Sequence, residues 1–395
     1  MRIGVDASCW LNRRGFGRYT RELLRAILAL DRHHEYCLFL DAETARRSED
    51  LPPLARAARV VVTTSAAAAQ AASADGRRSL SDLWAMRRAV AARDLDVMYF
   101  PAVYTYFPVR TRARVLVTKH DMTDRRYPEL IFPTRRSRFF WELKVRHAIH
   151  RADLVATVSE ASKRDIVRAF GLPDDRVRVV SDAVDPRFRP VGGVAASRSV
   201  IARYGIDPNR PFVLYVGGIS PHKNLETLLH AFADLAGRPA GSGINLVLVG
   251  DFTGDVFYSS YPAVQRTMAQ LELGRRVVFA GFVPDEDLVH CYNLAAVLVL
   301  PSLSEGFGLP ALEAMACGIP VVASNAGALP EVVGDAGLLV NPSDVAGLAD
   351  AMARLVGDET LRRQLGARGR ERAQGFTWEK SARAALALFD ELRPA

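Results

Sequence analysis

Cysteine is scarce in this sequence, and long apolar runs are absent. The 395 residues contain four cysteines, Cys9, Cys37, Cys291 and Cys317, and no C-x-x-C pair. This spacing argues against a zinc site or a disulfide framework and favours a reducing compartment. No apolar run approaches the roughly 18 residues that cross a bilayer. The N-terminus leads straight into a predicted strand, so we expect neither a membrane span nor a signal peptide.

Positive charge is concentrated in one half of the chain. Hydrophobic residues make up 49% of the sequence, which suffices for two domains that each have a core. The net charge is +8, but residues 1–190 hold 35 Lys and Arg against 23 Asp and Glu, whereas residues 191–395 hold 17 against 21. The basic half is expected to face anionic lipid, a phosphorylated carrier or nucleic acid, unless it only reflects an Arg- and Ala-rich composition.

The first half alternates predicted strands with helices. An initial strand, residues 1–7, is followed by Gly15 and Gly17 and by an amphipathic helix. Further strands are predicted at 36–40, 60–64, 96–100 and from Val115 to His120 and Asp121, with a helix at 80–92 and an Ala-rich loop at 66–74. The strand that begins at Val115 is predicted to end in His120 and Asp121. Ligands gather at the carboxyl ends of parallel strands, so His120 is either a site residue or a structural histidine.

Aromatic residues occur in two stretches of this half. Tyr104, Tyr106 and Phe107 could form a stacking wall for a sugar or acyl acceptor, or could pack in the core. A later basic segment combines arginines with the run Phe139 to Trp141. It predicts either a helix that lies on a membrane surface or one whose aromatic residues face the core while its arginines are solvated. The next helix is expected to have Ser159 as its N-cap.

The second half begins with a predicted linker, Pro186 to Ser199, rich in Pro, Gly and Ala. A buried strand and a glycine turn follow, and a helix is expected to start near Asn224. Lys223 stands at that helix start with Ser220 close by. The lysine charge and the helix dipole together favour binding of a diphosphate. A lysine exposed on the surface beside an ordinary helix cap would give the same sequence pattern.

The most informative stretch runs from Leu298 to Ala323. It predicts a strand at 297–300, a glycine-containing loop, a helix from Pro310 and a second strand at 319–322. The loop presents Glu305 and backbone N–H groups at a helix N-terminus, and Glu313 lies about a turn into the helix. Both glutamates could be ligand-binding, or could merely face solvent beside a well-capped helix.

Glu305 and Glu313, separated by seven residues, resemble the E-x7-E signature of the family 4 retaining glycosyltransferases. The resemblance implies an α/β protein of the GT-B fold, in which two Rossmann-like domains with parallel sheets face each other across a cleft. It implies an acceptor domain at 1–190, a nucleotide-sugar donor domain at 191–375, and a C-terminal helical segment at 376–395 that packs back on the first domain.

The resemblance also assigns roles to residues. Glu305 and His120 are expected to be catalytic, with Glu305 orienting the sugar and Glu313 binding ribose hydroxyls. The other expected donor-binding residues are Gly15, Gly17, Ser220, Lys223, Phe282, Val283, Phe307, Gly308 and Leu309. This chain departs from the family pattern at Gly218, where an arginine usually helps the lysine to grip the phosphates.

The implied activity is transfer of a mannose-, glucose- or GlcNAc-like hexose from a GDP- or UDP-sugar to a hydroxyl on a glycan, glycolipid or small metabolite, with retention. We expect no cofactor and no metal, since no D-x-D motif or His cluster stands near the phosphate loop. The protein is expected in the cytoplasm, with peripheral contact to an anionic inner membrane as an option. Alternatives are a non-catalytic nucleotide-sugar scaffold, a GT-B phosphorylase or epimerase, and a nucleic-acid binder.

Overall fold

The computed structural model describes residues 1–12, 14–47, 57–64, 79–251 and 259–394. The predicted Ala-rich loop at 66–74 lies outside the described residues. By its internal contacts the chain divides into two compact units. Unit 1 comprises 1–124, 132–182 and 378–395, and unit 2 comprises 125–131 and 183–377. Within the described ranges, no helix is both long enough and apolar enough to cross a membrane.

Unit 1 is built on a seven-stranded sheet in the order β3-β2-β1-β4-β5-β6-β7, and each described strand pair is parallel. Its strands are β1 (Arg2–Asp6), β2 (Glu35–Asp41), β3 (Ala57–Val62), β4 (Val97–Phe100), β5 (Arg114–Thr118), β6 (Leu154–Thr157) and β7 (Val177–Val179). The central strands are buried almost throughout, as expected for a parallel sheet that has helices on both faces.

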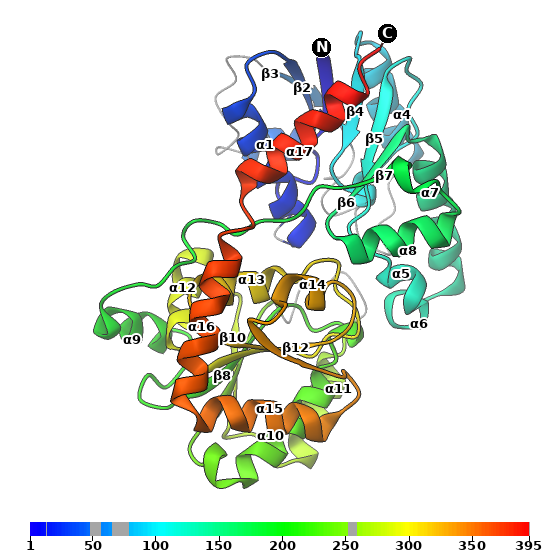
Figure 1. Ribbon diagram of the computed structural model, residues 1–395. Helices are drawn as coiled ribbons and strands as arrows, with labels where there is room; N and C mark the ends of the chain where they lie inside the picture. Colours follow the sequence, from blue (N-terminus) through cyan, green and yellow to red (C-terminus); the bar gives the residue numbers. More distant parts are fainter. Residues whose placement is uncertain (13, 48–56, 65–78, 252–258, 395) are drawn as a thin grey trace. The chain divides into compact units, whose positions relative to one another are not determined.

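Helices connect the strands of this sheet. They are α1 (Gly15–Leu30), α2 (Ala42–Arg47), α4 (Leu80–Ala91), α7 (Arg135–Arg151), α8 (Glu160–Phe170) and α17 (Trp378–Glu391), with short 3₁₀ turns η1 (Val103–Thr105) and η2 (Asp174–Arg176). The short helix α5 (Thr123–Arg126) begins in unit 1 and ends in unit 2. The last helix, α17, packs alongside α1, as Figure 1 shows. Ser159 caps α8 by accepting a hydrogen bond from the Ser162 N–H, as predicted.

Unit 2 has a six-stranded sheet in the order β10-β9-β8-β11-β12-β13, again with each described pair parallel. Its strands are β8 (Phe212–Val216), β9 (Asn245–Val249), β10 (Val277–Gly281), β11 (Val297–Leu300), β12 (Val321–Ser324) and β13 (Gly337–Val340). Each strand order is that of a Rossmann-like sheet, with the first strand beside the fourth. The predicted α/β class with two such domains is therefore confirmed.

The helical elements of unit 2 connect these strands. They are α6 (Pro128–Ile131), α9 (Val194–Ala202), η3 (Pro221–Lys223), α10 (Leu225–Gly237), η4 (Pro239–Gly241), α11 (Tyr261–Gln270), α12 (Asp285–Leu294), α13 (Leu309–Ala316), α14 (Leu329–Val333), α15 (Val345–Gly357) and α16 (Glu359–Ala373). Figure 1 shows α10 and α15 side by side along the sheet of this unit, and the two helices are in contact.

The predicted interdomain linker, Pro186–Ser199, is wrong in its position, because the whole stretch belongs to unit 2 and packs there. Its second part is the start of α9, which packs on α12. Its first part is bound to α12 through Asn293, which accepts a hydrogen bond from the Val191 N–H and donates one to the Arg189 carbonyl. Alanine favours helix, so a composition that resembled a linker also suited a packed helix.

The strand predicted at 319–322 begins two residues later, because residues 317–319 end the preceding helix. Gly318 adopts a left-handed conformation at φ +79°. The N–H groups of Gly318 and Ile319 return to the carbonyls of Met315 and Ala314. This is the Schellman arrangement of a helix C-terminus, and it leaves β12 to start at Val321.

Candidate active site

The neighbouring strands β8 and β11 mark the point where the sheet of unit 2 reverses its strand order. The chain leaves β8 toward one edge of the sheet and leaves β11 toward the other. In open α/β sheets, ligands bind outside the carboxyl ends of the strands at this point. The loops that follow the two strands are joined there, because the Leu303 N–H donates to the His222 carbonyl at 2.8 Å.

Lys223 and Glu305 meet at this junction. The Lys223 Nζ atom lies 2.8 Å from Glu305 Oε1, and the Ser302 hydroxyl donates to the same carboxylate oxygen at 2.7 Å. The two charged side chains are 22% and 14% exposed, so the pair is partly shielded yet open to a ligand. Sequence reasoning selected both residues, but it missed their mutual contact and the part that Ser302 plays.

The backbone around Glu305 is held by the loop that follows β12. The Ala328 N–H donates to the Glu305 carbonyl at 3.0 Å. Gly327, at φ +61°, lies so close that an added Cβ would stand 2.6 Å from that carbonyl oxygen. Only glycine fits such an approach at positive φ. Gly327 therefore belongs to the framework of the site, and a glycine after a polar turn was its only sequence signal.

The helix α13 begins beside this carboxylate. Its N-cap, Gly308, has φ +99°, and a Cβ there would meet the Leu329 side chain at 2.6 Å. Pro310 occupies the first turn, where its missing N–H costs nothing. Phe307 is buried and packs edge-to-face on Phe376. These contacts fix the peptide groups from Phe307 to Leu309 at the positive end of the helix dipole.

Glu313 is buried within α13, with only 3% of its surface exposed. The Tyr292 hydroxyl donates to its Oε2 atom at 2.7 Å. Sequence reasoning missed Tyr292, which lies on α12 and has no motif of its own. A carboxylate that is taken this far out of water requires hydrogen-bond donors, so Tyr292 both satisfies and orients it.

The turn that carries Lys223 is the 3₁₀ segment η3. Asn224 follows it at φ +60°, and its side-chain amide donates to the carbonyls of Pro301 and Pro342. This anchors the start of α10, where the helix was predicted. Ser220 is buried at the beginning of the turn. Gly218 offers no side chain, and its carbonyl accepts a hydrogen bond from the Tyr215 hydroxyl at 2.7 Å.

Phe282 and Val283 follow the edge strand β10. Phe282 is 49% exposed, whereas Val283 is buried. Their predicted contact with the nucleotide base through backbone groups stays a prediction.

His120 follows β5 in unit 1 and is buried. Its Nε2 atom lies 3.0 Å from the Pro101 carbonyl, and its own carbonyl accepts from the Ser162 hydroxyl at 3.1 Å. A carbonyl can only accept, so Nε2 carries the proton and Nδ1 has the lone pair. Burial lowers the pKa of His120 to about 4, so the ring is neutral at ordinary pH. The Tyr19 ring packs edge-on against the His120 ring, with the two ring centroids 4.8 Å apart.

Gly15 and Gly17 lie in the first turn of α1, where they have different surroundings. A Cβ on Gly17 would stand 2.1 Å from the Asn12 carbonyl oxygen, so this glycine lets the helix pack on its own preceding loop. Among the residues that the structure describes, a Cβ built on Gly15 has no neighbour within 4 Å beyond the adjoining backbone. Arg21 holds the same loop, since its guanidinium donates to the carbonyls of Trp10 and Asn12. The predicted ligand role of the glycines stays a prediction.

The aromatic stretch after β4 contributes one aromatic side chain that reaches the surface, Tyr104. Tyr106 and Phe107 are buried and pack around Phe100, as the packing alternative predicted. Tyr104 is half-buried and stacks on Phe16 with ring centroids 4.5 Å apart. The predicted stacking wall is therefore reduced to Tyr104.

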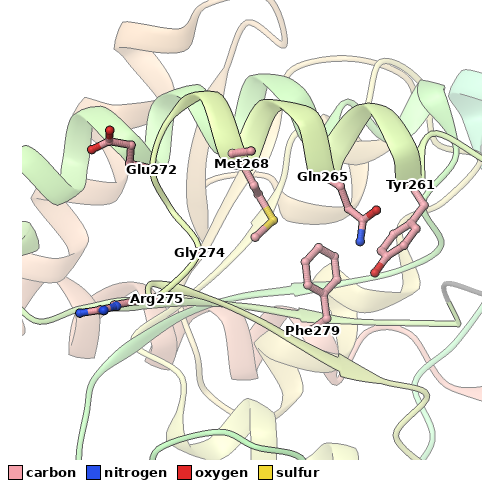
Figure 2. A pocket seen from close by; sticks show the side chains of 8 residues that line it. Tyr261, Gln265, Met268, Glu272, Gly274, Arg275 and Phe279 are labelled. Carbon is pink, nitrogen blue, oxygen red and sulfur yellow. The ribbon is translucent and has the colours of Figure 1, made fainter.

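A separate groove of about 520 Å³ lies between α11 and the edge strand β10. Figure 2 shows Gln265 and Met268 pointing from the helix toward Phe279 of the strand. None of the predicted site residues lines this groove. In the described part of the chain, no group of three or more His, Cys, Asp or Glu side chains is gathered as a metal would require.

Two family profiles match this chain. One, described as Glycosyltransferase Family 4, covers residues 13–188, and the other, Glycosyl transferases group 1, covers residues 197–372. The O-antigen chain mannosyltransferase B of Escherichia coli is 32% identical over 298 residues, which span 74% of each chain. The chain belongs to glycosyltransferase family 4. The predicted family is confirmed, and so is the expectation of an enzyme of the hexosyltransferase class.

Other relatives of this glycosyltransferase agree with the assignment. The D-inositol 3-phosphate glycosyltransferase of Nocardia farcinica is 32% identical over 248 residues, which span 62% of this chain and 54% of the relative. Among solved structures, the sucrose-phosphate synthase of Thermosynechococcus elongatus has a TM-score of 0.76 at 23% identity, with 99% of each chain covered. HepE from Anabaena, solved with UDP-glucose, has a TM-score of 0.73 at 21% identity, covering 98% of this chain and 99% of HepE. These neighbours support the GT-B fold.

Proposed function

We propose that this glycosyltransferase moves a hexose from a GDP- or UDP-sugar to a hydroxyl of a glycan, glycolipid or small metabolite, with retention of anomeric configuration. The observation that carries the proposal is the contact of Lys223 with Glu305 at the strand-order reversal of unit 2. Relatives named as mannosyltransferases and as inositol 3-phosphate glycosyltransferases support a hexose, and the HepE complex supports a UDP-sugar as one donor class to test.

In this mechanism the donor diphosphate binds at the turn from Ser220 to Lys223. Negative charge develops on the diphosphate as the sugar leaves, and the lysine and the N–H groups at the start of α13 stabilise it there. Glu305 lies beside the lysine and hydrogen-bonds hydroxyls of the sugar, which becomes oxocarbenium-like. Glu313, oriented by Tyr292, binds the ribose hydroxyls.

His120 acts as a neutral hydrogen-bond acceptor in this proposal. Its Nε2–H is committed to Pro101, so Nδ1 is the atom that accepts from a sugar hydroxyl. A ring with a pKa of about 4 is a poor general acid near neutral pH, so positioning of the sugar is the role that suits it. We assign no covalent nucleophile, and retention follows from departure and attack on one face of the sugar.

The test is release of nucleoside diphosphate from UDP-, GDP-, ADP- and dTDP-sugars, with and without bacterial lipid extract as an acceptor source. Release from one donor, lost in Glu305→Ala while the nucleotide still binds, supports the proposal. Turnover of Glu305→Ala at the wild-type rate removes this residue from the mechanism. Absence of release from every donor contradicts the proposed donor class.

We also propose that the reaction needs no cofactor and no metal ion, with Lys223 and backbone N–H groups providing the charge stabilisation. Release is then expected to be unchanged by EDTA. A loss of activity in EDTA that Mg²⁺ or Mn²⁺ restores would contradict this part of the proposal.

A second proposal concerns the helix α7 and a membrane. Trp141 is buried, as the core alternative predicted, but Phe139, Phe140 and Leu143 are 62%, 54% and 56% exposed. These three side chains share one face of the helix. Exposed arginines flank them, at positions 135, 136, 138 and 146. We propose that this apolar stripe inserts into the headgroup region of an anionic membrane while the arginines meet its lipids.

Such a contact agrees with a protein of the cytoplasm that reaches the inner membrane face. The four cysteines are all free and buried, which suits a reducing compartment. The test is co-sedimentation with vesicles of phosphatidylglycerol and of phosphatidylcholine. We expect binding to the anionic vesicles, weakened by salt and lost in Phe139→Ser/Phe140→Ser. The control Leu80→Ser/Trp84→Ser removes two exposed apolar side chains of α4 and should bind normally. Equal loss in both double variants would refute the assignment to α7.

A further inference from the structure

The only lysine of the Ser220–Lys223 turn forms an ion pair that carries no net charge. Lys223 is neutralised by Glu305 at 2.8 Å, and Gly218 stands where the family resemblance places an arginine. A nucleoside diphosphate carries two or three negative charges near neutral pH. An ion pair with no net charge attracts such an anion weakly, since the carboxylate opposes what the ammonium attracts. A diphosphate at this turn would therefore be bound more tightly if a further cation stood beside Lys223 and the backbone N–H groups.

A short segment of the chain lies against this same turn. Residues 125–131 belong to unit 2, although the stretches on both sides of them, up to 124 and from 132, belong to unit 1. The helix α6 within this segment packs on η3, the turn that carries Lys223. The Tyr127 hydroxyl donates to the Leu303 carbonyl at 3.4 Å. Leu303 in turn donates its N–H to His222, so hydrogen bonds connect Tyr127 with the η3 turn.

Two arginines immediately precede Tyr127. Arg125 is half-buried and Arg126 is exposed. Arginine is always charged and can form two parallel hydrogen bonds to a phosphate, which makes it the usual partner of this group. Tyr127 and α6 hold the backbone of this segment against η3, and the two arginines directly precede Tyr127 in the chain.

We propose that the segment 125–131 is part of the donor site, and that Arg125 and Arg126 supply the diphosphate-binding charge that Gly218 does not. The inference rests on the proposed function, because it presumes a nucleoside diphosphate at the Ser220–Lys223 turn. It adds residues from a part of the sequence that no phosphate-binding motif marks.

The experiment is calorimetric titration of the full chain with UDP, UMP, GDP and GMP. The variants are Arg125→Ala, Arg126→Ala, the double alanine variant and the double lysine variant, with Arg266→Ala on the exposed face of α11 as the control. We expect the double alanine variant to weaken diphosphate binding about tenfold or more, which is the typical effect of losing a charged hydrogen bond. Monophosphate binding should change less, and the lysine variant should keep most of the affinity.

A complementation step separates charge from shape. Adding Gly218→Arg to the double alanine variant places a guanidinium at the position expected from the family, and diphosphate affinity should rise again. Wild-type diphosphate affinity in the double alanine variant overturns the inference while the proposed function stands. If the affinities for mono- and diphosphate fall equally and Gly218→Arg does not restore them, the inference is overturned, and the two arginines have a structural role. If the wild-type chain binds none of the four nucleotides, the proposed function fails first.

Discussion

Removal of the charge of Glu305 should strengthen the binding of nucleoside diphosphate while it abolishes transfer. The carboxylate lies 2.8 Å from Lys223 and cancels its charge. A phosphate held by Lys223 would stand about 6 Å from this carboxylate, where an effective dielectric constant of about 20 gives a repulsion of about 3 kcal/mol. Counter-ions and partial exposure reduce this to roughly 1–1.5 kcal/mol, or about a five- to tenfold lower Kd.

The informative variant is Glu305→Gln. It keeps the shape of the side chain and an oxygen that accepts from Lys223 and Ser302, and it removes only the charge. Titration calorimetry with UDP and GDP measures the affinity, and nucleoside diphosphate release measures turnover. Glu359→Gln, on the exposed surface of α16, is the control for loss of a negative charge elsewhere. Unchanged or weaker binding of the preferred nucleotide in Glu305→Gln would refute the electrostatic reasoning.

Three further predictions concern residues that the structure places in defined surroundings. The pKa of His120 is about 4 in the folded protein against 6.5 in the unfolded chain, so between pH 4 and pH 6.5 the unfolded chain binds more protons. The free energy of unfolding should therefore fall by up to about 3 kcal/mol as the pH drops from 6.5 to 4. In urea unfolding, His120→Phe should lack this pH-dependent loss of stability. Gly17→Ala should lower the unfolding free energy by about 1–3 kcal/mol through overpacking, whereas Gly15→Ala, in open space, should be neutral or stabilising in thermal unfolding. Tyr292→Phe should cost about 1–3 kcal/mol by leaving the buried Glu313 carboxylate short of a donor, and should raise the KM of the sugar donor more than it lowers kcat.

Each of these has a result that would contradict it. An identical slope of stability against pH in His120→Phe would show that another group titrates. Equal melting temperatures of the two glycine variants would mean that the loop before α1 moves aside without cost. A donor KM at the wild-type value in Tyr292→Phe would separate Glu313 from nucleotide binding, whatever the effect on stability.

Periodicity and local chemistry predicted the elements of this protein well where they depend on neighbours in the sequence. The two parallel sheets follow from short apolar strands that alternate with helices. Ser159 was recognised as an N-cap because an N-cap is satisfied within three residues. The shifted start of β12 was missed because Gly318, which ends α13, resembles an ordinary glycine before a strand.

Surface and core were harder to assign within one helix. Phe139, Phe140 and Trp141 are consecutive, so at most part of this run can face one neighbour. The helical period of α7 places Trp141 on a different face from Phe139 and Phe140. Which of these faces is buried depends on the elements that pack on the helix, and the sequence of α7 does not show them. The same applied to the predicted linker, whose alanines form a helix because α12 offers a surface on which to pack.

Local patterns and the E-x7-E spacing were enough to predict the fold class and the family correctly, and they supplied most of the candidate site residues, whose roles stay predictions. The tertiary structure decided what those residues do to one another. Lys223 and Glu305 are 82 positions apart, and only the adjacency of β8 and β11 makes them an ion pair. Tyr292 meets Glu313 because α12 contacts α13, and Tyr127 meets Leu303 beside the contact of α6 with η3. Charge and hydrogen bonding act over a few ångströms of space, and sequence distance does not report that separation.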